Sequence, residues 1–390
     1  MKKSISSLLI SFLISLFSYS QSTFTITTTG TTPTIDSAIT YATDIWGAHL
    51  LSNIPIKINV IYTNLTGAGP LGITFPNGRK DFTSAPQAST WYASCLANAI
   101  SNTELNTGEV DMDIYMNSAN NYYFGLDANP GNTQYDFISV LLHEIAHGLG
   151  MISSSSVNSN EGSFGLIDSS SFAPLYPTFP FPSLDALPTA LDRLIINGSN
   201  QVITDTNLFA NISLALKNQF ESNDLFFNGF HSTLANNGNL VKVYAPNPFE
   251  SGSSINHIDE SSFPVSGGNS MITPFISNGE ANHQIGDILL GLLNDIGWNI
   301  YPLTDVSQNN NFQNLSIYPN PSNRKFNLDF NQELDYLKVN VYDITGKKVF
   351  SKNYHNTYNI GIDLFNRNKG VYIIEIISED IEIRRLLCLE

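Results

Sequence analysis

The sequence predicts two folded parts: an α+β domain over residues 21–302 and a small β-sandwich over residues 314–390. Three observations support this division. Helical and strand-like segments alternate in the first part, whereas the second part contains only short strands with alternating apolar side chains. Between the two, residues 303–313 are polar and lack apolar periodicity, which is typical of a linker.

The α+β domain is expected to open with a strand, a helix and a second strand, at residues 24–28, 35–51 and 54–62. Residues 111–116 alternate between polar and apolar side chains, which predicts a strand next to the cleft that holds the functional residues. Residues 154–256 are rich in Ser, Asn and Pro and include a weaker helical pattern at 208–220. We expect them to form a lobe that shapes access to this cleft.

The most informative stretch of the chain is His143-Glu144-Ile145-Ala146-His147. Two histidines four residues apart on a helix project from one face, so both imidazoles can bind the same zinc ion. Glu144 follows the first histidine and can act on a zinc-activated water as a general base, which is the arrangement that a zinc peptidase requires. The alternative is a helix that carries the same residues on a solvated face and has no metal.

The flanking residues predict that this helix belongs to the core. Asp136 can cap the free amides at the start of the helix. Apolar side chains recur near helical spacing and provide one face for burial: Phe137, Val140, Leu141, Ala146 and Leu149. Gly150 can adopt the left-handed conformation that turns the chain out of the helix. The two histidines should therefore point from a buried helix into a cleft.

A catalytic zinc site usually has three protein ligands and one open position, so a third ligand is expected. The extended form of the motif places a histidine at position 153, but this chain has Ser153 there. His49 lies in the predicted first helix and His355 lies in the C-terminal part, so neither is a serious candidate. Three candidates remain: His231, His257 and His283.

With these residues the chain resembles the metzincin clan of zinc peptidases, and within it the leishmanolysin-like proteins and a group of secreted bacterial zinc proteases. The resemblance rests on the helix motif and on segments at residues 90–92, 121–125, 135–150, 244–249, 257–260, 269–271 and 293–298. In leishmanolysin-like proteins a long insertion separates the second and third histidines. The corresponding insertion here is residues 154–256.

The resemblance implies that His257 is the third zinc ligand, because Met271 follows it in an Asn-Ser-Met-Ile-Thr-Pro turn. In the clan, the methionine of this Met-turn forms an apolar floor beneath the zinc ligands. His283 follows Met271, and His231 precedes no turn at comparable spacing, so both are weaker alternatives. Thr273 stands where some metzincins place an extra tyrosine ligand, so no fifth ligand is expected.

These residues predict a secreted zinc endopeptidase that cleaves protein or peptide substrates. Zinc held by His143, His147 and His257 would lower the pKa of a water to about 7, and Glu144 would serve as the general base. Two alternatives share the motif: a zinc-binding surface or adhesion protein without catalysis, and a hydrolase of a non-peptide amide. Clusters of Asp and Asn could ligate calcium, but none has the spacing of a defined calcium loop.

The N-terminal residues predict export. Lys2 and Lys3 precede an apolar run over residues 8–17, and small residues follow before Gln21, as in a secretory signal peptide spanning residues 1–20. This run is too short to cross a bilayer, and no other apolar run is long enough to do so. Loss of both lysines changes the formal net charge from −16 to −18 (−16 − 2), which excludes nucleic-acid binding through general electrostatics.

The C-terminal part is expected to be all-β, with strands near residues 315–318, 325–328, 338–343, 349–350, 370–376 and 381–387. It resembles the C-terminal sorting domain of the type IX secretion system of Bacteroidetes. The resemblance rests on the Tyr-Pro-Asn-Pro start, the Tyr-Asp-Ile-Thr-Gly-Lys-Lys hairpin and the Lys-Gly-Val-Tyr strand. It implies that the secretion machinery recognises residues 314–390 and carries the chain through the periplasm and outer membrane, to be secreted or held at the cell surface. A generic adhesion-type sandwich is the alternative.

Overall fold

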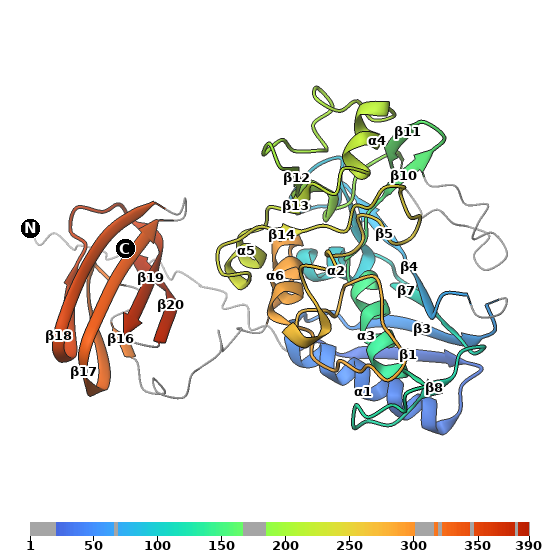
Figure 1. Cartoon of the computed structure of the whole chain (residues 1–390), viewed down its shortest axis with the longest axis horizontal. Coiled ribbons are helices and arrows are strands. Elements are labelled where there is room, and N and C mark those ends of the chain that lie inside the picture. Colours follow the sequence, from blue (N-terminus) through green and yellow to red (C-terminus); the bar gives the residue numbers. More distant parts are fainter. Residues whose placement is uncertain are drawn as a thin grey trace, which may run out of the picture. The chain divides into compact units, whose positions relative to one another are not determined.

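The computed structural model describes residues 21–65, 69–166, 185–300, 316–318, 322–343, 347–378 and 381–389. The chain divides into two compact units, residues 1–301 and residues 302–390 (Figure 1). The expected signal peptide, residues 1–20, and the expected linker, residues 303–313, lie outside the described residues.

A four-stranded sheet underlies the first unit. Its strands lie in the order β1 (Phe24–Thr29), β3 (Ile56–Thr63), β7 (Met112–Asn117) and β4 (Gly72–Pro76). The first three run parallel, and β4 pairs antiparallel with β7. Side chains of β3 alternate between buried and half-buried positions, as expected for an inner strand with one face on the core.

The edge of this sheet corrects one expectation. The sequence predicts that the strand near residues 111–116 lies next to the cleft, but β7 lies inside the sheet, between β3 and β4. Strand β4 is the edge strand, and its residues line the cleft instead. The pattern of β4 is weak because its five residues, Gly-Ile-Thr-Phe-Pro, begin with glycine and end with proline, which are both poor strand formers.

The first helix, α1 (Pro33–His49), begins two residues before the expected start. Thr32 caps it, and proline at the first helical position has the backbone angle that a helix needs. The helix also ends earlier than expected, because the next two residues form strand β2 (Leu50–Leu51). This strand pairs antiparallel with β15 (Asn299–Ile300).

Two buried tryptophans hold the histidine-bearing helix, α3 (Phe137–Gly148), in the core. The indole N–H of Trp46 on α1 donates to the carbonyl of Leu142 at 3.1 Å. The indole N–H of Trp298 donates to the carbonyl of Leu149 at 2.8 Å. Each bond satisfies a polar atom that would be costly to bury alone, so the large rings can pack against α3 without penalty.

The C-terminal end of α3 packs closely on the sheet through a glycine. A Cβ atom added at Gly148 would lie 2.0 Å from Sδ of Met112 on β7, so no larger residue fits without a shift. On the other side, the buried thiol of Cys95 donates to the carbonyl of Gly148 at 3.3 Å. Cys95 lies in the first turn of α2 (Ser94–Ser101). A further long helix in the described part of this unit is α6 (Asp287–Ile296).

The insertion predicted at residues 154–256 contains small elements: β10 (Ser155–Asn158), β11 (Glu161–Phe164), β12 (Ile195–Asn197), α4 (Leu214–Phe220), β13 (Leu225–Phe227), α5 (Phe230–Ala235) and β14 (Val241–Lys242). Helix α4 is shorter than the helix expected at residues 208–220. It begins only after Ser213, whose side chain caps it and whose extended backbone bridges to Gly162. The other short strands of the unit are β5 (Gly78–Lys80), β6 (Trp91–Ala93), β8 (Tyr122–Tyr123) and β9 (Tyr135–Asp136).

The second unit is a five-stranded antiparallel sheet with its own apolar core. Its strands are β16 (Ser316–Tyr318), β17 (Lys325–Asp343), β18 (Lys348–Asp363), β19 (Gly370–Ser378) and β20 (Ile381–Leu389). The separate strands expected at residues 325–328 and 338–343 are one long strand, β17. A register shift between Asp329 and Leu334 lets this strand bend where the sequence pattern suggests an interruption.

No helix of the described residues is long and apolar enough to span a membrane.

We predict that residues 21–301 fold without the second unit, because each unit encloses its own buried cluster of side chains. The purified fragment should show a cooperative thermal transition at the temperature at which the first unit unfolds in the full chain. Calorimetry of both proteins measures this. An insoluble fragment, or one without a cooperative transition, would show that the second unit is a structural part of the first.

Candidate metal centre

Local sequence places the first two histidines. Asp136 caps α3, because its Oδ1 accepts a hydrogen bond from the backbone N–H of Ser139 at 2.7 Å. Gly150 has a φ angle of 118° and turns the chain away after the last turn of the helix. Both features confirm the sequence prediction. The helix between them presents His143 and His147 one turn apart, on the same face.

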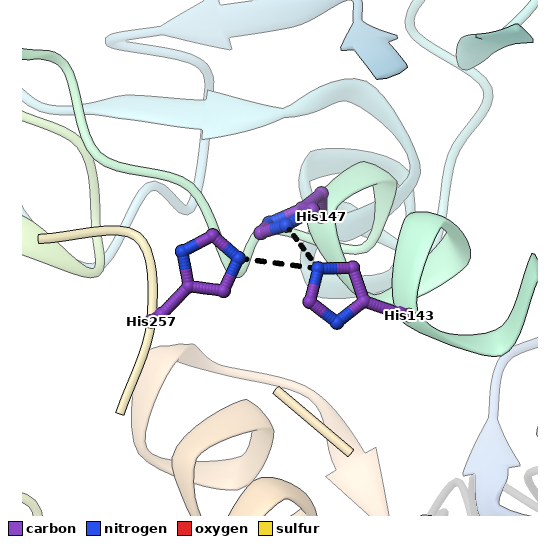
Figure 2. A group of neighbouring side chains, drawn as sticks. All are labelled: His143, His147 and His257. Carbon is purple, nitrogen blue, oxygen red and sulfur yellow. Dashed lines mark hydrogen bonds between the residues drawn. The ribbon is translucent and has the colours of Figure 1, made fainter. Parts of the chain in front are cut away.

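The structure brings His257 to these two residues, from a segment that follows the insertion. Nε2 of His143 lies 3.0 Å from Nε2 of His147 and 3.1 Å from Nε2 of His257. Figure 2 shows the three rings converging, with dashed lines between these nitrogen atoms. Together they form the only cluster of three or more metal-binding side chains among the described residues.

Backbone carbonyls fix the tautomer of all three rings. Nδ1 of His143 lies 2.8 Å from the carbonyl of Met271, Nδ1 of His147 lies 2.6 Å from that of Met151, and Nδ1 of His257 lies 2.7 Å from that of Ser253. A carbonyl oxygen can only accept, so each Nδ1 carries the proton and donates it. In the neutral rings each Nε2 is then an unprotonated acceptor, and the short Nε2–Nε2 distances bring three lone pairs together.

The surroundings keep these rings neutral. Burial lowers the pKa of all three imidazoles, and it lowers that of His147 to about 3. The neighbouring rings lower the pKa of His147 and His257 further, because a positive charge on one disfavours a charge on the next. The backbone carbonyls oppose this effect only in part. Neutral imidazole is the form that binds a metal ion.

The donor set fits zinc. Tetrahedral zinc with Zn–N bonds of about 2.0–2.1 Å requires nitrogen atoms roughly 3.3 Å apart, which is close to the observed 3.0 and 3.1 Å. Three imidazoles leave the fourth position open, as in a catalytic rather than a structural site. The carbonyls on Nδ1 are the outer partners that zinc-binding histidines generally have.

Glu144 projects toward the edge strand and is almost completely buried, with 6% of its surface exposed. The hydroxyl of Thr74 on β4 donates to its Oε2 at 2.7 Å. Burial raises the pKa of Glu144 to about 7, although the bond from Thr74 opposes the rise. Gly72 leaves the necessary space, because a Cβ atom at that position would lie 2.7 Å from Oε1 of the carboxylate. No sequence pattern signals the roles of Gly72 and Thr74, since both depend on the placement of an edge strand.

Met271 lies in a tight turn against the site. The backbone N–H of Thr273 donates to the carbonyl of Ser270 at 3.1 Å, which closes the turn. The Met271 side chain is buried and lines the same cavity as the three histidines, and its carbonyl orients His143. The hydroxyl of Thr273 donates back to Ser270, so it is engaged within the turn.

A cleft of about 820 Å³ opens over the site. Its walls are the edge strand β4, helix α3, the start of the insertion, and the segments that carry His257 and Met271. The lining combines apolar side chains with Ser and Asn, and its charged members are Glu144 and Glu280. A cavity of this size and mixed lining can hold several residues of an extended chain.

The other candidate histidines have different partners. The backbone N–H of His231, at the start of α5, donates to Oδ1 of Asp295 at 2.7 Å. Nε2 of His283 lies 2.8 Å from Oδ1 of Asp136, at the capped end of α3. Neither belongs to the cluster formed by His143, His147 and His257.

Comparison with known proteins identifies the C-terminal part. Residues 316–389 match the family model described as secretion system C-terminal sorting domain. This match confirms the predicted localisation: the chain is exported by type IX secretion and is released or held at the cell surface. Residues 98–228 match a second family model, described as SPBPB7E8-like.

No curated protein matches the chain. Among solved structures, a DUF3244 family protein with an immunoglobulin-like β-sandwich fold from Bacteroides vulgatus is 14% identical. That match covers 20% of this chain and 83% of the other chain, with a TM-score of 0.18.

We predict that His257→Ala loses zinc, whereas His231→Ala and His283→Ala keep it. Removal of His257 leaves two ligands, which bind zinc weakly. Zinc content after dialysis, measured by atomic emission, tests the three variants side by side. A His257→Ala protein that retains one zinc per chain would contradict the assignment.

Deletion of residues 314–390 should trap the protein in the periplasm, because the sorting domain is the part that the secretion machinery recognises. Immunoblots of fractions from a bacterium with type IX secretion would locate the truncated chain. The full chain with Glu144→Gln is the matched control and should be exported normally. Appearance of the truncated chain in the medium would assign export to another segment.

Proposed function

We propose that the first unit is a secreted zinc-dependent endopeptidase. One observation carries the proposal: three acceptor nitrogens converge next to a buried carboxylate at the base of an open cleft. A structural zinc site would be closed by a fourth protein ligand, and it would need neither the carboxylate nor the cleft. The sorting domain agrees with this proposal, since it marks the chain as an exported protein.

His143, His147 and His257 would hold the metal. A zinc ion bound there supplies Lewis-acid chemistry, which activates a water as nucleophile and polarises the carbonyl of the substrate. The carbonyls of Met271, Met151 and Ser253 keep the three rings in the required tautomer and orientation. The protein thus prepares the ligand set before the metal binds.

Glu144 would serve as the proton carrier. Its carboxylate accepts a proton from the attacking water and passes that proton to the nitrogen of the departing amine. The Thr74 hydroxyl holds this carboxylate against the edge strand by a hydrogen bond. Gly72 has no side chain there and so leaves room for the carboxylate. A fixed base needs little reorganisation at the moment of proton transfer.

The cleft favours an extended peptide as substrate. Strand β4 pairs with β7 on one side, and its residues 72–75 line the cleft. A peptide laid along such an edge can form main-chain hydrogen bonds that do not depend on its sequence. This geometry explains why an amide of the peptide backbone, rather than a small non-peptide amide, is the proposed target.

We predict that Glu144→Gln abolishes cleavage of casein while zinc stays bound. The substitution keeps the size of the side chain but removes the base, which typically reduces the rate by about 10²–10⁴-fold or more. Peptidase assays and zinc analysis on the same preparations test this.

The outcomes separate the proposal from its main alternative. Chelation should stop cleavage by the unsubstituted chain, and added zinc should restore it. If the unsubstituted chain binds one zinc and cleaves nothing, the protein is a zinc-binding surface protein without catalysis. If Glu144→Gln retains the full rate, Glu144 is not the base.

A further inference from the structure

The two ends of the insertion, residues 154–256, lie next to each other. The backbone N–H of Ser153 donates to Oδ1 of Asn256 at 2.7 Å, across a separation of 103 residues. Ser153 occupies the position where the extended motif places its third histidine. Asn256 immediately precedes His257, the histidine that takes over this role in the cluster. The two ends of the insertion are therefore joined next to the third imidazole.

The Ser153 end of this link is anchored by a buried carboxylate from within the insertion. Asp192 is completely buried, and its Oδ1 accepts a hydrogen bond from the hydroxyl of Ser153 at 2.5 Å. Its Oδ2 accepts from the N–H and the hydroxyl of Ser154, at 3.0 and 2.9 Å, and from the N–H of Thr189 at 2.8 Å. Three of these four donors belong to Ser153 and Ser154, so Asp192 fixes the short segment that follows α3.

The Asn256 end of the link is held in an unusual conformation. Ile255 has a φ angle of 70°, in the left-handed region that branched side chains disfavour, although it is fully buried. Its N–H donates to the carbonyl of Tyr244 at 2.9 Å, and the N–H of Tyr244 donates to the carbonyl of His257 at 2.9 Å. Surrounding contacts must maintain such a backbone, and the bond from Ser153 to Asn256 is one of them.

The same two segments orient two of the three imidazoles. Two residues before Ser153, the carbonyl of Met151 accepts from Nδ1 of His147. The carbonyl of Ser253, four residues before His257, accepts from its Nδ1. A shift of one segment relative to the other would therefore change the angle between these two rings.

We propose that Asn256 is a positioning residue for the third zinc ligand, with Asp192 fixing the segment on which it docks. This inference rests on the zinc site of the proposed function, but not on peptidase activity. It gives the insertion a second role besides the expected one of shaping access to the cleft. The bond between its two ends holds the segment of His257 next to the segment that follows α3. The link takes the place of the direct chain connection that a third histidine at position 153 would have in the uninterrupted motif.

The test is the zinc affinity of the full mature chain, measured by competition with a chromophoric chelator. Asn256→Ala should bind zinc about 10–100-fold more weakly, the loss typical when a ligand loses its outer partner, because the link holds the segments whose carbonyls orient His147 and His257. The cobalt(II)-loaded protein should also change its visible absorption spectrum, which reports the geometry of the ligands. Asn256→Asp keeps the acceptor oxygen for the N–H of Ser153, but its second oxygen faces the carbonyls of Gly252 and Ser254, to which Nδ2 of Asn256 donates at 3.3 and 3.4 Å. It should therefore bind zinc more tightly than Asn256→Ala but less tightly than the unsubstituted chain.

Asn211→Ala is the matched control. Asn211 lies in the same insertion, and its side chain likewise accepts from a backbone N–H, that of Phe164, at 2.8 Å. It also donates to the carbonyls of Phe164 and Ala186 at 3.1 and 3.0 Å, so its loss costs at least as many bonds. Its substitution should lower the thermal stability of the metal-free protein but leave the zinc affinity and the cobalt spectrum unchanged.

Equal zinc affinities for Asn256→Ala and Asn211→Ala would overturn the proposal. If Asn256→Ala does not fold, the comparison of Asn256→Asp with Asn256→Ser decides between the outcomes. The serine side chain is too short for its oxygen to reach the N–H of Ser153. Tighter zinc binding by Asn256→Asp than by Asn256→Ser supports the proposal. Zinc binding by Asn256→Ser that is as tight as that of the unsubstituted chain overturns it. An unsubstituted chain that binds neither zinc nor cobalt would instead refute the proposed function, and one that binds both without cleaving casein would refute only its catalytic part.

Discussion

The structure of the site depends on three hydrogen bonds from imidazole N–H groups to backbone carbonyls. They assign the proton of His143, His147 and His257 to Nδ1, so three Nε2 lone pairs point to one place. Without a cation this arrangement brings acceptor atoms together and is unfavourable, and burial prevents the rings from relieving it by taking up protons. The backbone geometry therefore leaves three lone pairs available to a metal ion, as the proposed function requires.

The rest of the first unit can be understood as support for these bonds. Trp46 and Trp298 fix the helix that carries two of the rings, each through an indole bond to a carbonyl of that helix or its end. The Met271 turn supplies one of the three carbonyls and is itself closed by a backbone bond. Thr74, on the edge strand β4, holds Glu144. The proposed base thus shares α3 with two of the proposed ligands, the third ligand comes from a distant segment, and each side chain is held by a hydrogen bond with another part of the chain or with its own segment.

The sequence predicted the parts of the site that depend on local spacing. The cap at Asp136, the turn at Gly150 and the shared face of His143 and His147 all follow from rules that act within a few residues, and the structure has them. The edge strand that holds Glu144 was not predicted, because its short Gly-Ile-Thr-Phe-Pro segment gains its strand partner only from the folded sheet. The bond between Ser153 and Asn256 joins residues that no local pattern connects. The third histidine could be proposed only through resemblance, for the same reason.

The most direct measurement of the central claim is the X-ray absorption spectrum of the purified mature protein at the zinc edge. The account predicts one zinc per chain, with three imidazole nitrogens at about 2.0–2.1 Å and one oxygen ligand. A spectrum with fewer than three imidazoles, with a sulfur ligand, or a protein that takes up no zinc at all would contradict it.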